Sequence, residues 1–181
     1  MSNLTVMEPA EPLTPDDQRG PDRVDRTAAR LATWLARHSV DILRISLGLV
    51  FLGFAVLKYF PGVSPAEDLA VRTVETLSLG MLSGYGALIA TAIVETFIGI
   101  TLITGKLLRA GLLVLGGAMV GILSPLVLFF GDLFPGAPTL EAQYVLKDIV
   151  LVAAALVVTA GALGARLVTD RTNSAVNGQQ V

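Results

Sequence analysis

Glu95 is the only charged residue between Glu75 and Lys106, in a segment that is apolar enough to cross a membrane. It lies ten residues after Tyr85 and nine before Thr104, hence roughly 14 Å from either end of the helix that this segment predicts. A carboxylate at that depth is costly unless it is paired, hydrated or protonated. Two kinds of chemistry meet this constraint: an ion pair that fixes the register of two helices, or a site that binds a ligand or carries a proton.

Four other ionisable side chains in the apolar segments could complete such a site: Arg44, Lys58, Lys147 and Asp148. Counted by helical rise, Arg44 and Lys147 each lie about 8 Å from Glu95 in depth. We expect Arg44 to be the partner, because a guanidinium group is permanently charged and its planar donors suit a buried carboxylate. Lys58 lies near the end of its segment, where its amine could equally reach the lipid headgroups.

Lys147 and Asp148 are adjacent, so on a helix their side chains point about 100° apart and only one of them faces a given neighbour. Together with Lys58 they could form a polar pocket that opens outward and is covered by the short segment after Pro61. An ordinary cluster of charges at a helix end is the alternative. Both interpretations stay open at this stage.

The residue types exclude several classes of cofactor site. The chain has no cysteine, which excludes disulfides, thiol redox chemistry and Cys-ligated iron or zinc. Its single histidine, His38, excludes a bis-His haem and a metal site built from several histidines. We therefore expect no metal site and no cofactor carried by the chain itself, while a quinone bound between the helices stays open.

The elements that position these residues are predicted to be membrane-spanning helices. The chain is 53% hydrophobic and 15% charged, against roughly 25% charged residues in soluble domains. Its apolar runs lack the alternation of a β-barrel, which leaves helices as the structure that satisfies the backbone in lipid. Four spans are expected, at about 40–60, 85–104, 107–130 and 143–163. The predicted fold class is an all-α, integral membrane four-helix bundle.

Glycine and proline mark the ends and contacts of these helices. Gly105 should end the second span and Pro125 should bend the third. A capping box at 64–67, with proline at the first helical position, predicts a short surface helix after the first span. The small residues expected at helix packing contacts are Gly48, Gly99, Gly117 and Gly121. The last two form a Gly-x-x-x-Gly motif, which we expect to pack inside the bundle rather than to mediate dimerisation.

Three regions make up the expected domain organisation: a disordered cytoplasmic tail at 1–22, a four-span membrane domain at 23–168 and a cytoplasmic tail at 169–181. Within the membrane domain, residues 24–38 have arginines on one helical face and apolar residues with Trp34 on another. This pattern predicts an N-terminal amphipathic helix that lies in the membrane interface. A simple extension of the first span is the alternative.

The distribution of basic residues predicts the orientation of the chain in the membrane. If the N-terminus is inside, nine basic residues belong to the inner segments, namely Arg19, Arg23, Arg26, Arg30, Arg37, Lys106, Arg109, Arg166 and Arg171. Three belong to the outer segments, namely Lys58, Arg72 and Lys147. Because inner segments carry the excess of Lys and Arg, both termini are predicted to be cytoplasmic.

Short motifs occur in all four predicted spans. They are Arg44-Ile45-Ser46 and Leu57-Lys58-Tyr59-Phe60-Pro61, then Val94-Glu95-Thr96-Phe97-Ile98-Gly99, then Gly116-Gly117-Ala118-Met119 and Ser124-Pro125-Leu126-Val127, and finally Val145-Leu146-Lys147-Asp148. In this order they resemble the YkgB/RclC family of bacterial inner-membrane proteins, which is related to the DoxX group. The resemblance implies a four-helix protein of the bacterial inner membrane. It also implies a link to survival of reactive chlorine and other oxidants, or to quinone-linked redox complexes.

These observations lead to one expected function and two alternatives. We expect a YkgB/DoxX-type accessory protein in oxidative-stress resistance or envelope redox, with Arg44, Lys58, Glu95, Lys147 and Asp148 as an intramembrane polar site. The alternatives are a membrane subunit of a quinone-linked oxidoreductase complex and a small transporter or channel. We do not expect the chain to be an enzyme on its own. Its expected partner is the lipid bilayer; a redox protein or a second copy of the chain stays open, and no nucleic acid is expected.

Overall fold

The structure is a computed structural model that describes residues 23–165. Its contacts divide the chain into two units, 1–37 and 38–181, which are described separately. In the first unit the described residues are helical. The predicted tails at 1–22 and 169–181 lie outside the described residues. The site residues all belong to the second unit.

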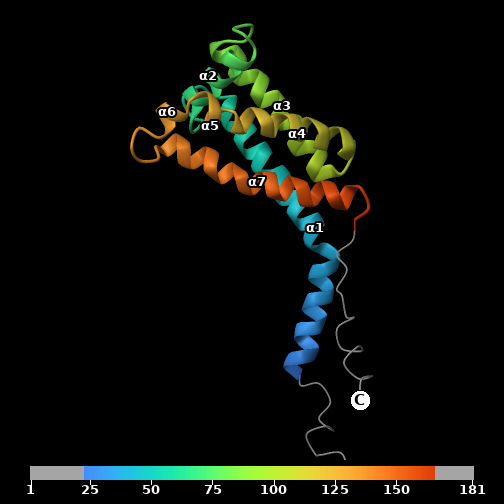
Figure 1. The fold of residues 1–181 in the computed structure, drawn as a ribbon. Helices are drawn as coiled ribbons and strands as arrows, with labels where there is room; N and C mark the ends of the chain where they lie inside the picture. Colours follow the sequence, from blue (N-terminus) through green and yellow to red (C-terminus); the bar gives the residue numbers. More distant parts are fainter. Residues whose placement is uncertain (1–22, 166–181) are drawn as a thin grey trace, which may run out of the picture. The chain divides into compact units, whose positions relative to one another are not determined.

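Seven helices follow one another along the described part of the chain (Figure 1). They are α1 Arg23–Lys58, α2 Glu67–Leu77, α3 Gly84–Thr104, α4 Leu108–Leu123, α5 Pro125–Leu128, α6 Phe130–Leu133 and α7 Leu140–Ala162. Residues 23–165 contain no strand, so the all-α prediction is confirmed. Four helices are long and apolar enough to cross a membrane: Arg26–Lys58, Gly84–Thr104, Leu108–Leu128 and Leu140–Ala162. These four helices fit a multi-pass membrane protein.

Most predicted helix ends are confirmed, for the expected reasons. Gly105 ends α3 in the left-handed conformation, with φ of 70°, and its N–H donates to the carbonyl of Thr101 at 3.0 Å. The predicted bend at Pro125 is confirmed, because α4 ends at Leu123 and Pro125 opens the separate short helix α5. The last helix begins earlier than predicted, since the hydroxyl of Thr139 accepts from the N–H of Ala142 at 3.1 Å and caps it.

The predicted capping box at 64–67 is wrong. α2 begins at Glu67, and Ala66 before it adopts a left-handed conformation with φ of 56° and provides no side-chain cap. The carboxylate of Glu67 turns back to Gly62 instead, whose N–H donates to it at 2.8 Å. Pro65 therefore lies in the turn before α2 rather than at its first helical position.

α1 includes both the predicted interfacial helix at 24–38 and the predicted first span as one element. Its exposed side chains in the first unit include Leu31 and Trp34. The location of this segment at a membrane interface stays a prediction.

Within the second unit, neighbouring long helices run in opposite directions. Val40 of α1 touches Gly161 near the end of α7, and Thr101 of α3 touches Gly111 near the start of α4. Both contacts lie at the same end of the unit, which we call the α3–α4 end. At the opposite end, which we call the α2 end, the hydroxyl of Tyr85 donates to the carbonyl of Tyr59 at 3.3 Å.

Two groups of buried apolar residues hold the second unit together. The larger group lies among the long helices and consists of Leu47, Phe51, Ile98, Leu102, Leu115, Met119, Ala155 and Val158. A smaller group lies beneath α2 and consists of Leu69, Leu133, Ala142 and Val145. The long helices α3 and α4 lie beside each other, and α7 crosses the C-terminal half of α1 in Figure 1.

The expected helix contacts at glycine occur at one pair of positions and not at another. Gly48 and Gly99 bring α1 and α3 together so closely that a Cβ atom on Gly99 would lie 2.9 Å from the carbonyl oxygen of Gly48. Gly117, by contrast, has no neighbour within 4 Å of a Cβ atom, and for Gly121 the nearest is Leu77 at 3.9 Å. The Gly-x-x-x-Gly motif therefore makes no close helix contact inside this unit.

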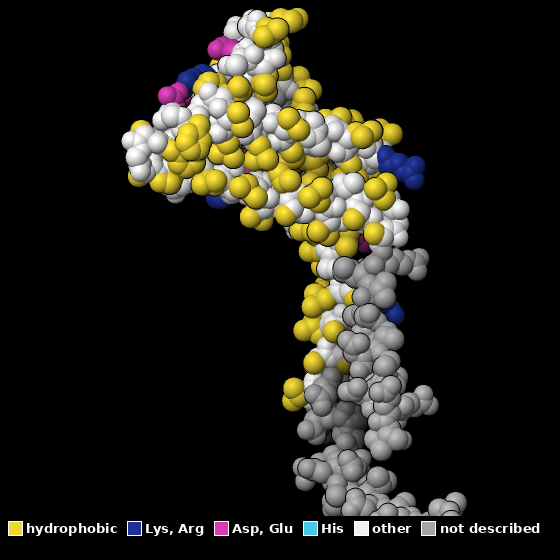
Figure 2. Space-filling model, viewed as in Figure 1, with side chains coloured by type: hydrophobic (Ala, Val, Ile, Leu, Met, Phe, Trp, Pro, Cys, Tyr) yellow, Lys and Arg dark blue, Asp and Glu magenta, His cyan; other side chains and the backbone are white. Residues whose placement is uncertain are grey.

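The outer faces of the long helices are apolar. Large exposed side chains include Leu113, Val120, Val150 and Leu156. Figure 2 shows hydrophobic side chains spread over the faces of α3, α4 and α7, while most of the charged groups in view gather near the ends of these helices. Such a surface is expected where the solvent is lipid.

The glycine contact gives a first prediction. Gly99→Ala should lower the free energy of unfolding by about 1–3 kcal/mol, because the new methyl group would overlap the backbone of α1. Gly117→Ala is the matched control: its methyl group meets open space, so the helix should be unchanged or stabilised by about 0.5–1 kcal/mol. Unfolding of the purified protein in mixed detergent micelles measures both. Equal effects of the two substitutions would contradict the close contact between α1 and α3.

Candidate functional site

Glu95 forms a buried ion pair with Lys58. The amine Nζ of Lys58 lies 3.0 Å from Oε1 and 2.9 Å from Oε2 of Glu95, so it donates to both oxygens. The side chains are only 9% and 8% exposed. The predicted pairing of Glu95 with Arg44 is wrong, and Lys58 does not extend to the surface.

The direction of the Cα–Cβ bond explains why these two residues meet. Side chains on a helix lean toward its N-terminus. Lys58 is the last residue of α1, so this lean carries its amine back into the bundle, where Nζ lies 5.6 Å from the centre of the Phe54 ring. α3 runs in the opposite direction, so Glu95 leans toward the α2 end. The two side chains therefore converge.

Arg44 has a different role, at the α3–α4 end. Its Nη1 donates to the carbonyl oxygens of Leu102 and, at 3.4 Å, of Ile103, both in the last turn of α3. Its Nη2 lies 3.4 Å from Asp41. Carbonyls in the last turn of a helix lack partners within the helix and carry partial negative charge, so a guanidinium group stabilises this end. The lean of the side chain toward the start of α1 directs Arg44 away from Glu95.

Lys147 and Asp148 also separate. Lys147 is exposed, and its Nζ lies 3.9 Å from the centre of the Tyr144 ring, so it makes a cation–π contact on its own helix. Asp148 is half-buried and lines the same cavity as Lys58 and Glu95. The structure thus brings three of the five predicted site residues together and places Arg44 and Lys147 elsewhere.

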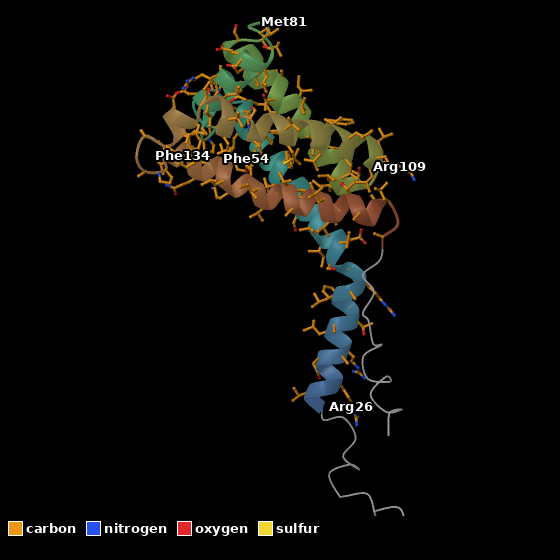
Figure 3. All side chains as sticks on the ribbon, viewed as in Figure 1. Arg26, Phe54, Met81, Arg109 and Phe134 are labelled. Atoms are coloured by element: carbon orange, nitrogen blue, oxygen red, sulfur yellow. The ribbon has the colours of Figure 1, made fainter. Side chains whose placement is uncertain are left out.

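The ion pair forms part of the wall of a cavity of about 380 Å³. Most of the wall is apolar and comes from α1, α2, α3, α4 and α7, with side chains such as Phe51, Leu69, Val94, Ile122 and Leu151. Lys58, Glu95 and Asp148 supply the charged part. In Figure 3 the lining residue Phe54 lies among the crossing helices, away from Met81 and Arg109, which lie near the two ends of the unit.

Helix α2 covers the cavity and is tied to its surroundings by interactions that no sequence pattern predicts. Leu69 and Thr73 are buried on its inner face and line the cavity. Arg72 pairs with Asp132 at 2.8 Å and lies 4.6 Å from the centre of the Phe129 ring. The opposite charges at 72 and 132 are far apart in the sequence, and no spacing rule links residues 60 positions apart. A pocket covered by this helix is one of the two interpretations that the sequence leaves open, the other being an ordinary cluster of charges at a helix end.

This arrangement is suited to binding rather than to metal chemistry. Within residues 23–165 no group of three His, Cys, Asp or Glu side chains could hold a metal ion. A cavity with apolar walls and a few convergent polar groups is the usual form of a small-molecule site. The charged groups can hold the polar part of an amphipathic molecule, and the walls can hold its apolar part.

The ion pair gives a second prediction. Lys58→Met alone should lower the free energy of unfolding by about 3–5 kcal/mol, because it leaves a buried carboxylate without its partner. The double variant Lys58→Met/Glu95→Leu should regain most of that loss. A double-mutant cycle in mixed micelles measures the coupling. The exposed pair Arg72 and Asp132 is the control, with an expected coupling of about 1 kcal/mol or less. Losses that simply add in the double variant would contradict the pairing.

Arg44 gives a third prediction. Arg44→Met should lower the free energy of unfolding by about 1–3 kcal/mol, because carbonyls at the end of α3 lose a charged donor. Arg44→Lys keeps the charge without the planar fork and should recover part of this loss. Combining Arg44→Met with Glu95→Gln should give additive losses, since the two residues share no contact in the described structure. A coupling above about 0.5 kcal/mol would show that Arg44 and Glu95 act on each other.

Comparisons of this chain with protein-family models, with curated proteins and with solved structures give no match. Its function therefore has to be inferred from the site itself.

Proposed function

We propose that this chain is a four-span protein of the bacterial inner membrane that binds an amphipathic small molecule in the cavity beneath α2. The observation that carries the proposal is the location of the Lys58–Glu95 ion pair in the wall of a largely apolar cavity. Both termini are cytoplasmic in this proposal, so the α2 end faces the outer side of the membrane.

The cavity favours a binding role over a purely structural one for the ion pair. A pair that only fixes helix register needs close packing around it, as at Gly48 and Gly99. Here the pair adjoins a volume of about 380 Å³, within the range of about 300–1,000 Å³ that small-molecule sites occupy. A ligand in this volume could therefore contact the charged groups of Lys58 and Glu95 directly.

The surface of the second unit supports the membrane setting. Its long helices expose apolar side chains. Lys106 and Arg109 follow α3 at the α3–α4 end, but the second unit also carries Lys58, Arg72 and Lys147 in its outer segments, so the orientation rests on the count of nine against three over the whole sequence. An excess of Lys and Arg marks the cytoplasmic side of a membrane protein. The amphipathic segment at 24–38 would lie in the interface on the same side.

The proposed physiological role is that of an accessory protein. The chain has no cysteine and one histidine, so redox chemistry at this site would depend on a bound molecule or a partner protein. The resemblance to the YkgB/RclC and DoxX-related proteins suggests oxidative-stress resistance, including reactive chlorine, as the setting.

A quinone-binding subunit is the second candidate. The specific observation in its favour is the amine of Lys58 in the cavity wall, which could donate to a quinone oxygen while the apolar wall holds the ring and tail. This candidate requires a partner with its own redox centre.

Native mass spectrometry of the purified full chain is the test and gives a fourth prediction. The wild type should retain an amphipathic small molecule, and Lys58→Met/Glu95→Leu should retain clearly less of it although the double variant remains folded, because two of the three charged groups of the cavity wall are gone. Arg72→Gln/Asp132→Asn, which removes an ion pair outside the cavity wall, should retain the molecule. Equal retention by both double variants, or no retained molecule in the wild type after extraction into native lipid, would overturn the proposal.

A further inference from the structure

We infer that the cavity takes a cationic amphiphile, whose ammonium or equivalent group pairs with Asp148. This inference rests on the proposed binding function and specifies its ligand class. It follows from the charges that line the cavity, from the hydrogen bonds those charges already make, and from the aromatic rings beside them.

The charged groups of the cavity wall are unbalanced. Lys58, Glu95 and Asp148 line it, which places one amine against two carboxylates. Lys58 donates to both oxygens of Glu95. Asp148 has no hydrogen bond or ion pair with any of residues 23–165. A carboxylate in apolar surroundings is stabilised by a positive charge close to it, and a bound cation would provide one.

The two lysines closest to Asp148 do not fill this role. Lys58 and Lys147 both act on Asp148 electrostatically, and Asp148 acts on Glu95. Neither amine, however, is within ion-pair distance of Asp148. Lys58 is held by Glu95, and the amine of Lys147 lies over the Tyr144 ring outside the cavity wall.

Two hydroxyl groups of the wall are already committed as donors. Thr73 and Thr91 donate their hydroxyl hydrogens to the carbonyls of Leu69 and Ala87 in their own helices. The carboxylate of Asp148 accepts from no described residue. A ligand with a positive group meets the carboxylate of Asp148 better than an uncharged ligand does, and an anionic group would be repelled by the excess carboxylate.

Aromatic rings add to the preference for a cation. Phe51, Phe54 and Tyr144 line the cavity. Two of these rings already lie beside ammonium groups of the protein, at 5.6 Å for Phe54 with Lys58 and 3.9 Å for Tyr144 with Lys147. A cavity lined by both a carboxylate and aromatic rings is a combination that attracts ammonium ligands.

Binding of matched probes to the full chain in nanodiscs of zwitterionic lipid tests the inference, as a fifth prediction. The probes are dodecyltrimethylammonium, its uncharged counterpart 1-dodecanol and a short-chain quinone. The wild type should bind the cation at least about tenfold more tightly than either neutral probe, since charge-assisted contacts are worth that factor or more.

Three variants assign that preference to Asp148. Asp148→Asn should weaken binding of the cation about tenfold and leave 1-dodecanol unchanged, while Asp148→Glu should retain the preference. Asp68→Asn makes the same change of charge at an exposed position outside the cavity wall, and it should alter neither. If Asp148→Asn does not fold, the affinity of the wild type for the cation relative to the two neutral probes decides whether the cavity takes a cationic amphiphile.

The outcomes separate this inference from the function on which it rests. If the neutral probe or the quinone binds as tightly as the cation, and Lys58→Met/Glu95→Leu abolishes that binding, the cavity is a binding site but not one for cations. If none of the probes binds and no molecule is retained on purification, both proposals are overturned.

Discussion

Opposite charges on Lys58 and Glu95 lie 2.9 Å apart in largely apolar surroundings, and this pair constrains the elements around it. Each charge alone would be costly at this position, so the two helices that carry them have to keep their approach and register. The contact of Gly48 with Gly99 allows that approach, because neither residue has a side chain to hold the backbones apart.

The ion pair and the inner face of α2, which covers the cavity, both contribute to the composition of the cavity wall. The charged side chains come from three helices, with Lys58 on α1, Glu95 on α3 and Asp148 on α7, and most of the remaining wall is apolar, which is the composition of a small-molecule site. α2 is joined to the rest of the unit by exposed interactions, such as the pair between Arg72 and Asp132, while its inner face carries the buried Leu69. Exposed ion pairs contribute little stability, so the buried Leu69 holds this cover in place more than the pair between Arg72 and Asp132 does.

Most of the fold could be predicted from the sequence, whereas the pairing within the site could not be predicted from depth alone. The apolar runs, Gly105 and Pro125 act locally, and the helices end or bend where these residues lie. Depth along the membrane made Arg44 and Lys147 equally close to Glu95. The direction of the side chains distinguishes Lys58 from Arg44: Lys58, at the end of α1, leans toward Glu95, and Arg44, near the α3–α4 end of the unit, leans away from it. The lean of a side chain toward the N-terminus of its helix holds for every helix, but applying it here requires the direction in which each helix runs.

Four apolar helices, and a deep carboxylate that needs a partner, follow from the amino-acid sequence because the cost of placing a group in lipid depends on that group and its depth. The identity of the partner, the half-buried position of Asp148 and the volume beneath α2 follow from tertiary structure alone. These properties depend on how closely helices approach and cross, and Gly117 shows the limit of sequence patterns here: its motif is typical of helix contacts, yet its neighbours in the fold leave open space around it.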